Sequence, residues 1–530
     1  MKKCLSFIFK FTQDYIRYSE EEIQSNIPIL NDFFNSISNI YIPFLWMLEK
    51  FEKDNIPCKI GLVFPPVLCS MLSSKTLQEM YLQYLDKCIA LGELELKRNS
   101  NDKNVKKNVT EILENYKQIK HDYEEKYSRK LIPAFLNFMR KGMIEILGTC
   151  GTDIFLPHYA DLGAVVSAQI ESGLYSYRKY FGQIPEGFWL PEKGYCEGLE
   201  RFIKPYGYTY TVLDSRSFML SSKVPSSGIF CPVRASNSLA LFADDGEVDE
   251  ELYGENGIVY SDCFRNEKRD IGFDLPNEKL EVVLDKSQSR FATGYKYWNR
   301  KFNDEKNCVY NSEEAEGLVQ KAAEEFLDKR IERLSGAQKH LNGKNSISIL
   351  CTFDARQMLG NWHEGFSFFD SLIRLADKKA CDIEFCSNLF EKPYELEKAY
   401  PYYSAGIGAG YGENLISSRN CWMIRYVRKA SERMVDLVDR FPNDTGLKTR
   451  LLNLGAKELM IAQSANLAKM IDSNVFPELA KKRFTESIEA FTEVFDSLGS
   501  NVVSTEWLTK TEVKDNIFSW MNYRIFAVKK

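Results

Sequence analysis

The feature that most constrains the fold is an alternation of short apolar runs with amphipathic helical stretches over about the first 400 residues. Apolar runs of strand length occupy residues 4–11, 58–64, 144–150, 187–191, 208–214, 228–233, 346–354 and 381–386. Between many of them, apolar residues recur three and four positions apart, as at residues 74–98 and 312–340. Strands that alternate with helices form a mostly parallel sheet with crossover helices. The sequence therefore predicts an α/β fold, with its sheet either open or closed into a barrel.

Two regions depart from this alternation and indicate how the chain is divided. Residues 234–296 contain an acidic run and no clear helical pattern, which predicts an insertion or a long functional loop. A glycine-rich stretch at residues 404–415 is followed from about residue 420 by continuous helical periodicity. A chain of 530 residues exceeds what one hydrophobic core usually organises. We expect an α/β domain over residues 1–400, with an insertion or lid at about 234–296, and a helical domain over 401–530.

Charge and composition narrow the class of partner. The formal net charge of -5 leaves no basic field that could hold nucleic acid. No apolar run approaches the roughly 18 residues of a membrane span, and the cysteines lack the CxxC spacing of zinc and redox sites. The N-terminal apolar run is interrupted by Lys10, and no small-residue cleavage site follows it, which favours a buried strand over a signal peptide. We expect a cytoplasmic protein whose ligand is neutral or small.

Two carboxylates lie where predicted strands end. Glu192 follows the run GFWLP, and Asp354 closes the run SISILCTFD. In a barrel of parallel strands, catalytic residues lie at the carboxyl ends of the strands. Two facing carboxyl groups about 5 to 5.5 Å apart are the apparatus of a retaining glycosidase, and Trp189 and Trp362 offer faces on which sugar rings stack. From the residues alone, a strand-end acid that caps the next helix is the commoner arrangement.

The segments around both acids resemble the motifs of glycoside hydrolase family 57. GFWLPEKGY, at residues 187–195, is similar to that family's nucleophile motif, and CTFDARQMLGNWHEG, at residues 351–365, to the motif of its general acid/base. Further segments follow in the order seen in the subgroup similar to 1,4-α-glucan branching enzymes, as far as AKELMIAQSANLAKMI at residues 456–471. The resemblance implies an incomplete, seven-stranded TIM-like (β/α) barrel with an insertion and a C-terminal helical domain. It assigns Glu192 as nucleophile and Asp354 as general acid/base, with no metal and no organic cofactor.

Several positions differ from the family pattern. Lys10 and Thr12 stand at two histidine places of the first strand, and Asp153 stands at a third. After the second acid, Arg356 replaces a glutamate; an ion pair between Arg356 and Asp354 would lower the pKa of that acid and harm its role. The resemblance implies a substrate-binding set of Trp189, Trp362, Asp153, Lys10, His363, Trp298, Trp422 and Tyr260.

The leading functional hypothesis is an α-glucan transglycosylase of the branching type, which cleaves α-1,4 and forms α-1,6 linkages in glycogen, amylose or maltooligosaccharide. Tyr253 and Tyr260 of the insertion are the candidates for a lid that excludes water. The alternatives are a degenerate family member that binds α-glucan without turnover, and an amylase or 4-α-glucanotransferase. For a retaining enzyme we expect the carboxyl groups of Glu192 and Asp354 to lie roughly 5 to 7 Å apart.

Overall fold

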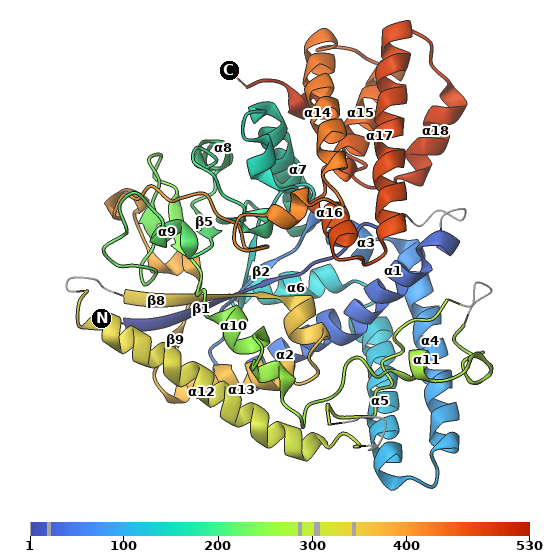
Figure 1. Ribbon diagram of the computed structural model, residues 1–530, viewed down its shortest axis with the longest axis vertical. Coiled ribbons are helices and arrows are strands. Elements are labelled where there is room, and N and C mark those ends of the chain that lie inside the picture. The colour runs from blue at the N-terminus through green and yellow to red at the C-terminus, as the bar shows by residue number, and fades with distance from the viewer. Residues whose placement is uncertain (1, 18–22, 285–288, 302–307, 342–345, 530) are drawn as a thin grey trace. The chain divides into compact units, whose positions relative to one another are not determined.

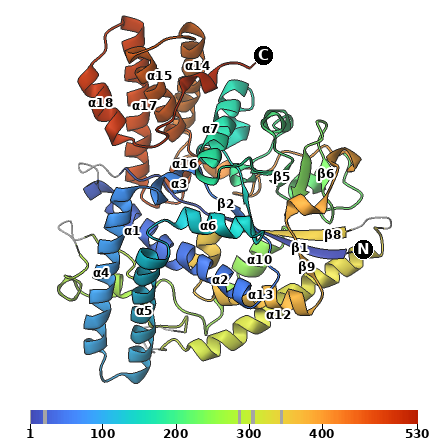
Figure 2. The same ribbon diagram turned by 180° about the vertical axis from the view of Figure 1, so that it is seen from behind.

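The protein forms two compact units, each assembled from three separate segments of the chain. The computed structural model describes residues 2–17, 23–284, 289–301, 308–341 and 346–529 (Figures 1 and 2). The first unit comprises Met1–Leu62, Met71–Glu145 and Gly246–Phe385, and the second comprises Val63–Ser70, Ile146–Asp245 and Cys386–Lys530. The predicted boundary near residue 400 stays a prediction. Residues 285–288 of the predicted insertion lie outside the described residues.

A mostly parallel sheet has most of its strand residues in the first unit. Its strands are β1 (Lys2–Lys10), β2 (Ile60–Val63), β3 (Ile144–Leu147), β8 (Ser346–Asp354) and β9 (Asp382–Ile383). The order is β3-β2-β1-β8, and β9 also pairs with β1. β1 and β8 are parallel, and their register pairs Lys10 with Asp354. The carboxyl ends of these two buried strands therefore place Lys10 and Asp354 at one edge of the sheet.

The helices of the first unit include those predicted at residues 74–98 and 312–340. They are α1 (Ile23–Ser36), η1 (Ile37–Tyr41), α2 (Ile42–Lys53), α4 (Lys75–Arg98), α5 (Lys103–His121), η2 (Asp122–Lys126), α6 (Leu131–Arg140), α10 (Val248–Tyr253), α11 (Ile271–Asp274), α12 (Ser312–Gln338), η8 (Arg356–Gly360) and α13 (Gly365–Lys378). Side-chain caps define two of their starts: Ser74 accepts from Leu77 N, and Asp102 accepts from Asn104 N and Val105 N. Figures 1 and 2 show α4 and α5 side by side.

The acidic run of the insertion, where the sequence showed no clear helix, forms α10. Its first turn carries Asp249, Glu250 and Glu251, and negative charge there is favourable because the first backbone N–H groups of a helix are unpaired. Helix α11 begins at a side-chain cap, where Asp270 accepts from Gly272 N. The insertion therefore contains short helices whose signal is in their caps and charges rather than in apolar periodicity.

The second unit has a sheet of its own. Its strands are β4 (Gly187–Trp189), β5 (Tyr210–Leu213), β6 (Val233–Arg234) and β7 (Ala240–Ala243). The order is β4-β5-β7-β6, with β4, β5 and β7 parallel and β6 antiparallel to β7. Gly148, directly after β3, forms a parallel bridge with Phe188. A side chain at Gly148 would not fit, because its Cβ would lie 2.6 Å from Tyr208 Oη.

The remaining helices of the second unit include the predicted C-terminal bundle. Those of the middle segment are η3 (Leu156–Tyr159), α7 (Gly163–Phe181), η4 (Pro191–Lys193), α8 (Glu200–Ile203) and α9 (Arg216–Met219), whereas α3 (Pro66–Leu72) crosses from the second unit into the first. The C-terminal helices are α14 (Trp422–Arg440), α15 (Leu447–Ala462), α16 (Ala465–Asp472), α17 (Pro477–Ser500) and α18 (Thr505–Lys514) (Figure 1, orange to red). α15 is buried along most of its length and packs against α14 and α17. No helix among the described residues has both the length and the apolar character needed to cross a bilayer.

Candidate active site

Glu192 lies in a strained turn directly after β4. Its backbone adopts φ 53° and ψ 22°, and Lys193 also has a positive φ, of 48°. A residue other than glycine in this left-handed region costs about 1 to 3 kcal/mol, and such residues concentrate at functional sites. The surrounding structure must therefore hold the turn in place.

Contacts on three sides hold this turn. Gly406 N donates to Glu192 O at 2.7 Å, and a Cβ at Gly406 would lie 2.4 Å from Lys193 Cε, so the glycine-rich stretch approaches the turn more closely than a side chain would allow. The Lys193 ammonium pairs with Asp244, which follows β7. The Glu192 side chain is 12% exposed, and its Oε1 accepts a hydrogen bond from Lys469 Nζ of α16 at 2.7 Å. An ammonium group at this distance favours the ionised carboxylate, which is the form that a nucleophile requires.

Asp354 closes β8 and accepts three hydrogen bonds. Its Oδ1 accepts from the backbone N of Arg356 at 2.9 Å and of Gln357 at 3.1 Å, so the acid caps the turn that follows the strand. Its Oδ2 accepts from Thr12 Oγ1 at 2.8 Å. Because a hydroxyl group can donate or accept, rotation of the Thr12 hydroxyl would allow Oδ2 to carry the proton of a general acid.

Arg356 does not neutralise Asp354. Its guanidinium pairs with Asp32 at 2.8 Å and donates to Gln13 Oε1 at 3.3 Å. Among the residues that the structure describes, no ion pair joins Arg356 to Asp354. Arg356 instead orders the stretch after β1 that contains Thr12, since its Nη2 lies 3.5 Å from the backbone O of Thr12. An Arg356–Asp354 ion pair would impair Asp354 as a general acid, and the described contacts of Arg356 do not include one.

Three further predicted residues lie in the first unit with Asp354: Lys10, Tyr253 and Tyr260. Lys10 is the partner of Asp354 in the strand register and is 7% exposed. Tyr253 ends α10, and its hydroxyl lies 3.7 Å from Met358 Sδ. Burial, together with the nearby carboxylates of Asp249 and Asp354, raises the pKa of Tyr253. Tyr260 is 50% exposed, and the Arg300 guanidinium lies 5.2 Å from its ring centroid.

The other predicted residues of the first unit lie in different surroundings. Trp362 is 1% exposed, with its ring centroid 5.8 Å from that of Phe264 and 5.2 Å from that of Phe368. Trp298 is half-buried and forms an isolated antiparallel bridge with Val309. His363 lines a pocket whose described lining does not include Asp354.

In the second unit, α16 contacts both Glu192 and Asp153. Asp153 is buried, its Oδ2 accepts from Asn466 Nδ2 at 3.0 Å, and its backbone O accepts from Ala465 N at 2.7 Å. Trp189 is 4% exposed. The remaining predicted residue of this unit, Trp422, packs edge to face on Phe484 with the ring centroids 5.3 Å apart.

Sequence reasoning did not identify Lys469 or Asn466. Both belong to one short helix whose apolar periodicity shows which face is buried but not which polar group the other residues meet. Glu192 belongs to the second unit and Asp354 to the first. The expected separation of roughly 5 to 7 Å between their carboxyl groups stays a prediction.

Comparison with known proteins places this chain among the carbohydrate-active enzymes of one family. Residues 6–387 match the family model described as glycosyl hydrolase family 57, and residues 426–526 match the model described as 1,4-alpha-glucan branching enzyme, C-terminal. The chain belongs to glycosyl hydrolase family 57. The resemblance seen in the motifs is therefore confirmed.

Three relatives illustrate the likeness. The 1,4-alpha-glucan branching enzyme TK1436 of Thermococcus kodakarensis is 23% identical, over 98% of this chain and 78% of the relative. The crystal structure of the alpha-amylase AmyC from Thermotoga maritima has a TM-score of 0.90 with 26% identity, covering 100% of each chain. The GH57-type branching enzyme from Pyrococcus horikoshii has a TM-score of 0.87 with 20% identity, covering 100% of this chain and 98% of that one. These likenesses confirm the predicted TIM-like α/β fold with a C-terminal helical region.

Proposed function

We propose that the protein is a retaining α-glucan transglycosylase of the branching type, which cleaves α-1,4 linkages and forms α-1,6 linkages in glycogen, amylose or maltooligosaccharide in the cytoplasm. One observation carries the proposal. The strained, largely buried carboxylate of Glu192 receives the Lys469 ammonium from α16, and α16 lies inside the region that matches the branching-enzyme C-terminal model. A carboxylate held ionised after a strand is what nucleophilic attack on an anomeric carbon requires.

The proposed reaction has two steps. Glu192 attacks the anomeric carbon of an α-1,4-linked glucosyl unit, and a bond forms between its carboxylate and that carbon while Asp354 gives its proton to the departing oxygen. Asp354, now ionised, takes the proton of the 6-hydroxyl group of an acceptor chain. That oxygen then displaces Glu192, which leaves as a carboxylate, and the α-1,6 linkage is complete.

Counting linkages tests the proposal. The protein is incubated with amylose, and α-1,6 linkages are measured as the chains released by a debranching enzyme. We expect new linkages with the wild type and with Glu186→Gln, a matched control because Glu186 is exposed and directly precedes β4. Glu192→Gln and Asp354→Asn should reduce branching to background. A Glu192→Gln protein as active as the wild type would refute the assignment.

The same assay separates the alternatives. An α-amylase is the second candidate, because AmyC, whose title names that activity, shares this fold along its whole length. Hydrolysis would produce new reducing ends without α-1,6 linkages, and a 4-α-glucanotransferase would redistribute the lengths of linear chains. A degenerate family member would bind maltooligosaccharide in calorimetry and form no product at any pH.

A further inference from the structure

The first unit contains a pocket of about 540 Å³ with both polar and apolar lining residues. Helices α2, α5 and α13 contribute to its wall, together with Arg265, Glu267, Gly294 and Lys296. This volume falls within the roughly 300 to 1,000 Å³ of small-molecule sites. Neither Asp354 nor Thr12 is among the described residues that line it. The pocket therefore requires an explanation separate from the chemistry at Asp354.

The charged residues of the wall argue against an anionic ligand. Arg265 Nε donates to Glu267 Oε1 at 3.2 Å, and Lys296 pairs with the same carboxylate. Burial acts to raise the pKa of Glu267, but the two cations outweigh it and hold the pKa at about 2. Lys50 pairs with Asp370 at 3.2 Å. These cations are neutralised by carboxylates of the wall, which also includes Glu111, Glu316 and Glu364, so a phosphate group would find no compensating positive charge.

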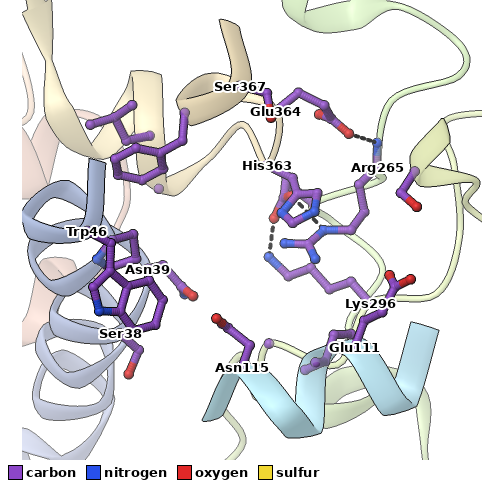
Figure 3. A pocket seen from close by; sticks show the side chains of 18 of the residues that line it. Ser38, Asn39, Trp46, Glu111, Asn115, Arg265, Lys296, His363, Glu364 and Ser367 are labelled. Atoms are coloured by element: carbon purple, nitrogen blue, oxygen red, sulfur yellow. Dashed lines mark hydrogen bonds and ion pairs between the residues drawn. The ribbon is translucent and has the colours of Figure 1, made fainter. Parts of the chain in front are cut away.

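The opposite side of the pocket carries neutral polar groups and an aromatic face. The Trp46 indole N–H donates to Asp122 Oδ2 at 2.8 Å, which fixes the orientation of the half-buried ring. Figure 3 shows the carboxamides of Asn39 and Asn115 reaching into the space between Trp46 and His363. A carboxamide carries both donors and an acceptor, so it can pair with a hydroxyl group in either direction.

His363 adds a neutral imidazole. Its side chain is exposed where it lines the pocket, and the ring of Tyr310 lies edge to face with the centroids 5.6 Å apart. Burial and the charge of Arg265 lower the pKa of His363 to about 3. At neutral pH the imidazole therefore carries one N–H donor and one acceptor nitrogen. No charge is added to this part of the wall.

We propose that this pocket binds a short neutral oligosaccharide, with a pyranose ring on the face of Trp46 and sugar hydroxyls hydrogen-bonded to Asn39, Asn115 and His363. Hydroxyl groups need partners that both donate and accept, and the apolar face of a pyranose needs an aromatic surface. The charges of the wall exclude an anionic ligand, the carboxylates can accept from sugar hydroxyls, and the aromatic face with its carboxamides favours a sugar. The choice of an α-1,4-linked chain rests on the proposed function.

Calorimetry with maltotriose tests the proposal in a protein that cannot turn it over. The full-length Glu192→Gln protein is titrated with maltotriose, and Trp46→Ala and Asn115→Ala are added separately in the same background. We expect Trp46→Ala to weaken one binding event roughly five- to tenfold, the cost of a lost stacking face. Asn115→Ala should weaken it about threefold or more through the lost hydrogen bonds. Trp507→Ala is the matched control, since Trp507 is a half-buried tryptophan of α18, and it should leave the affinity unchanged.

Three outcomes would overturn the proposal. They are no maltotriose binding at all, affinity unchanged by both pocket variants, and tripolyphosphate binding that Trp46→Ala or Asn115→Ala weakens. Asn115 is exposed on the surface of α5, so its replacement leaves a folded protein even where Trp46→Ala does not. A binding event sensitive to these variants, in a wild type that forms no α-1,6 linkages, would support the pocket and refute only the branching function. Branching without such binding would do the reverse.

Discussion

Lys469 Nζ lies 2.7 Å from Glu192 Oε1, so a helix near the end of the chain places a positive charge on the candidate nucleophile. The side chains are 26% and 12% exposed, and the pair is thus partly shielded from water. In the proposed reaction Glu192 loses its charge when the glycosyl-enzyme forms and regains it when the acceptor displaces it. The ammonium of Lys469 favours the charged state and therefore assists the second step.

Replacement of Lys469 by methionine should shift the pH dependence of the reaction. Without the ammonium, the carboxylate of Glu192 is protonated more readily, and the acidic limb of the profile of kcat/KM against pH should move to higher pH. Transfer from the glycosyl-enzyme should also slow, because the leaving carboxylate loses its counter-charge. The acidic limb and the rate of transfer are both measured from initial rates on amylose between about pH 4 and 8, where carboxyl and imidazole groups titrate.

Lys481→Met is the control for Lys469→Met. Lys481 also belongs to the C-terminal helices and pairs with the exposed Glu478 of α17. Its replacement should leave the profile unchanged. An acidic limb that stays in place in Lys469→Met would show that the contact is structural only.

Tyr253→Ala should raise hydrolysis relative to transfer. Tyr253 ends α10 of the insertion, and its hydroxyl lies 3.7 Å from Met358 Sδ, close enough to Asp354 for that carboxylate to influence it. Removal of the ring would admit water beside Asp354 and expose the glycosyl-enzyme to it. We expect the ratio of new reducing ends to α-1,6 linkages to rise severalfold. The more exposed Tyr260 is the comparison: a change in Tyr260→Ala alone would assign the water-excluding role to that residue.

Glu251→Gln should destabilise the protein. The Arg330 guanidinium is buried, lies 3.4 Å from the ring centroid of Phe326 and pairs with Glu251 of α10. Removal of one partner from a buried ion pair typically costs about 3 kcal/mol, because the remaining charge stays in the interior. Urea unfolding of the variant would measure this loss.

A compensating pair tests the reason for that loss. The double variant Arg330→Met, Glu251→Leu should recover most of the stability, since buried ion pairs are often replaceable by apolar residues. Lys329→Met, which removes an exposed partner of the same carboxylate, should change the free energy of unfolding by less than about 1 kcal/mol. A double variant no more stable than Glu251→Gln would contradict the explanation.

His158 should make stability depend on pH below neutrality. Burial and the charge of Arg428 lower the pKa of His158 from 6.5 to about 4. Between pH 6.5 and about pH 4, the imidazole is protonated in the unfolded chain but stays neutral in the folded protein. The contribution of His158 to the free energy of unfolding is therefore complete above pH 6.5, and it is lost as the pH falls from 6.5 towards 4.

The free energy of unfolding of the wild type, relative to that of His158→Gln, should accordingly fall by about 2 to 3 kcal/mol between neutral pH and about pH 4. Urea unfolding at a series of pH values measures it, with the exposed His121→Gln as control. A difference that does not vary with pH would show that the His158 imidazole titrates as it does in the unfolded chain.

The sequence predicted those elements whose signal is local. The apolar runs around β1 and β8 and the helical period of α12 are visible within windows of about ten residues. Asp354 ends β8 as expected, and Glu192 lies three residues beyond Trp189, the last residue of β4. The signal of α10 was hidden because its first turn depends on backbone N–H groups and acidic side chains.

Long-range contacts were beyond such reasoning. Arg356 is two residues from Asp354, which made that pair the obvious one. Backbone N–H groups already occupy Asp354 Oδ1, and the guanidinium instead pairs with Asp32, far away in sequence. Lys469 reaches Glu192 across 277 positions. The helical pattern predicts which face of α16 is buried, but it does not predict that Lys469 pairs with Glu192.

The pairing of β1 with β8 has a consequence for synthesis on the ribosome. β1 is complete at Lys10, and its register partner for that residue is Asp354, so 344 residues separate the two in the emerging chain. At a synthesis rate of about 5 to 20 residues per second, the edge of β1 that pairs with β8 stays unpaired for roughly 20 to 70 s. β2 protects another part of the strand much earlier, but the apolar edge destined for β8 is available to other nascent strands throughout. A chaperone that binds the N-terminal strand during this interval would raise the yield of folded protein without touching any residue of the site.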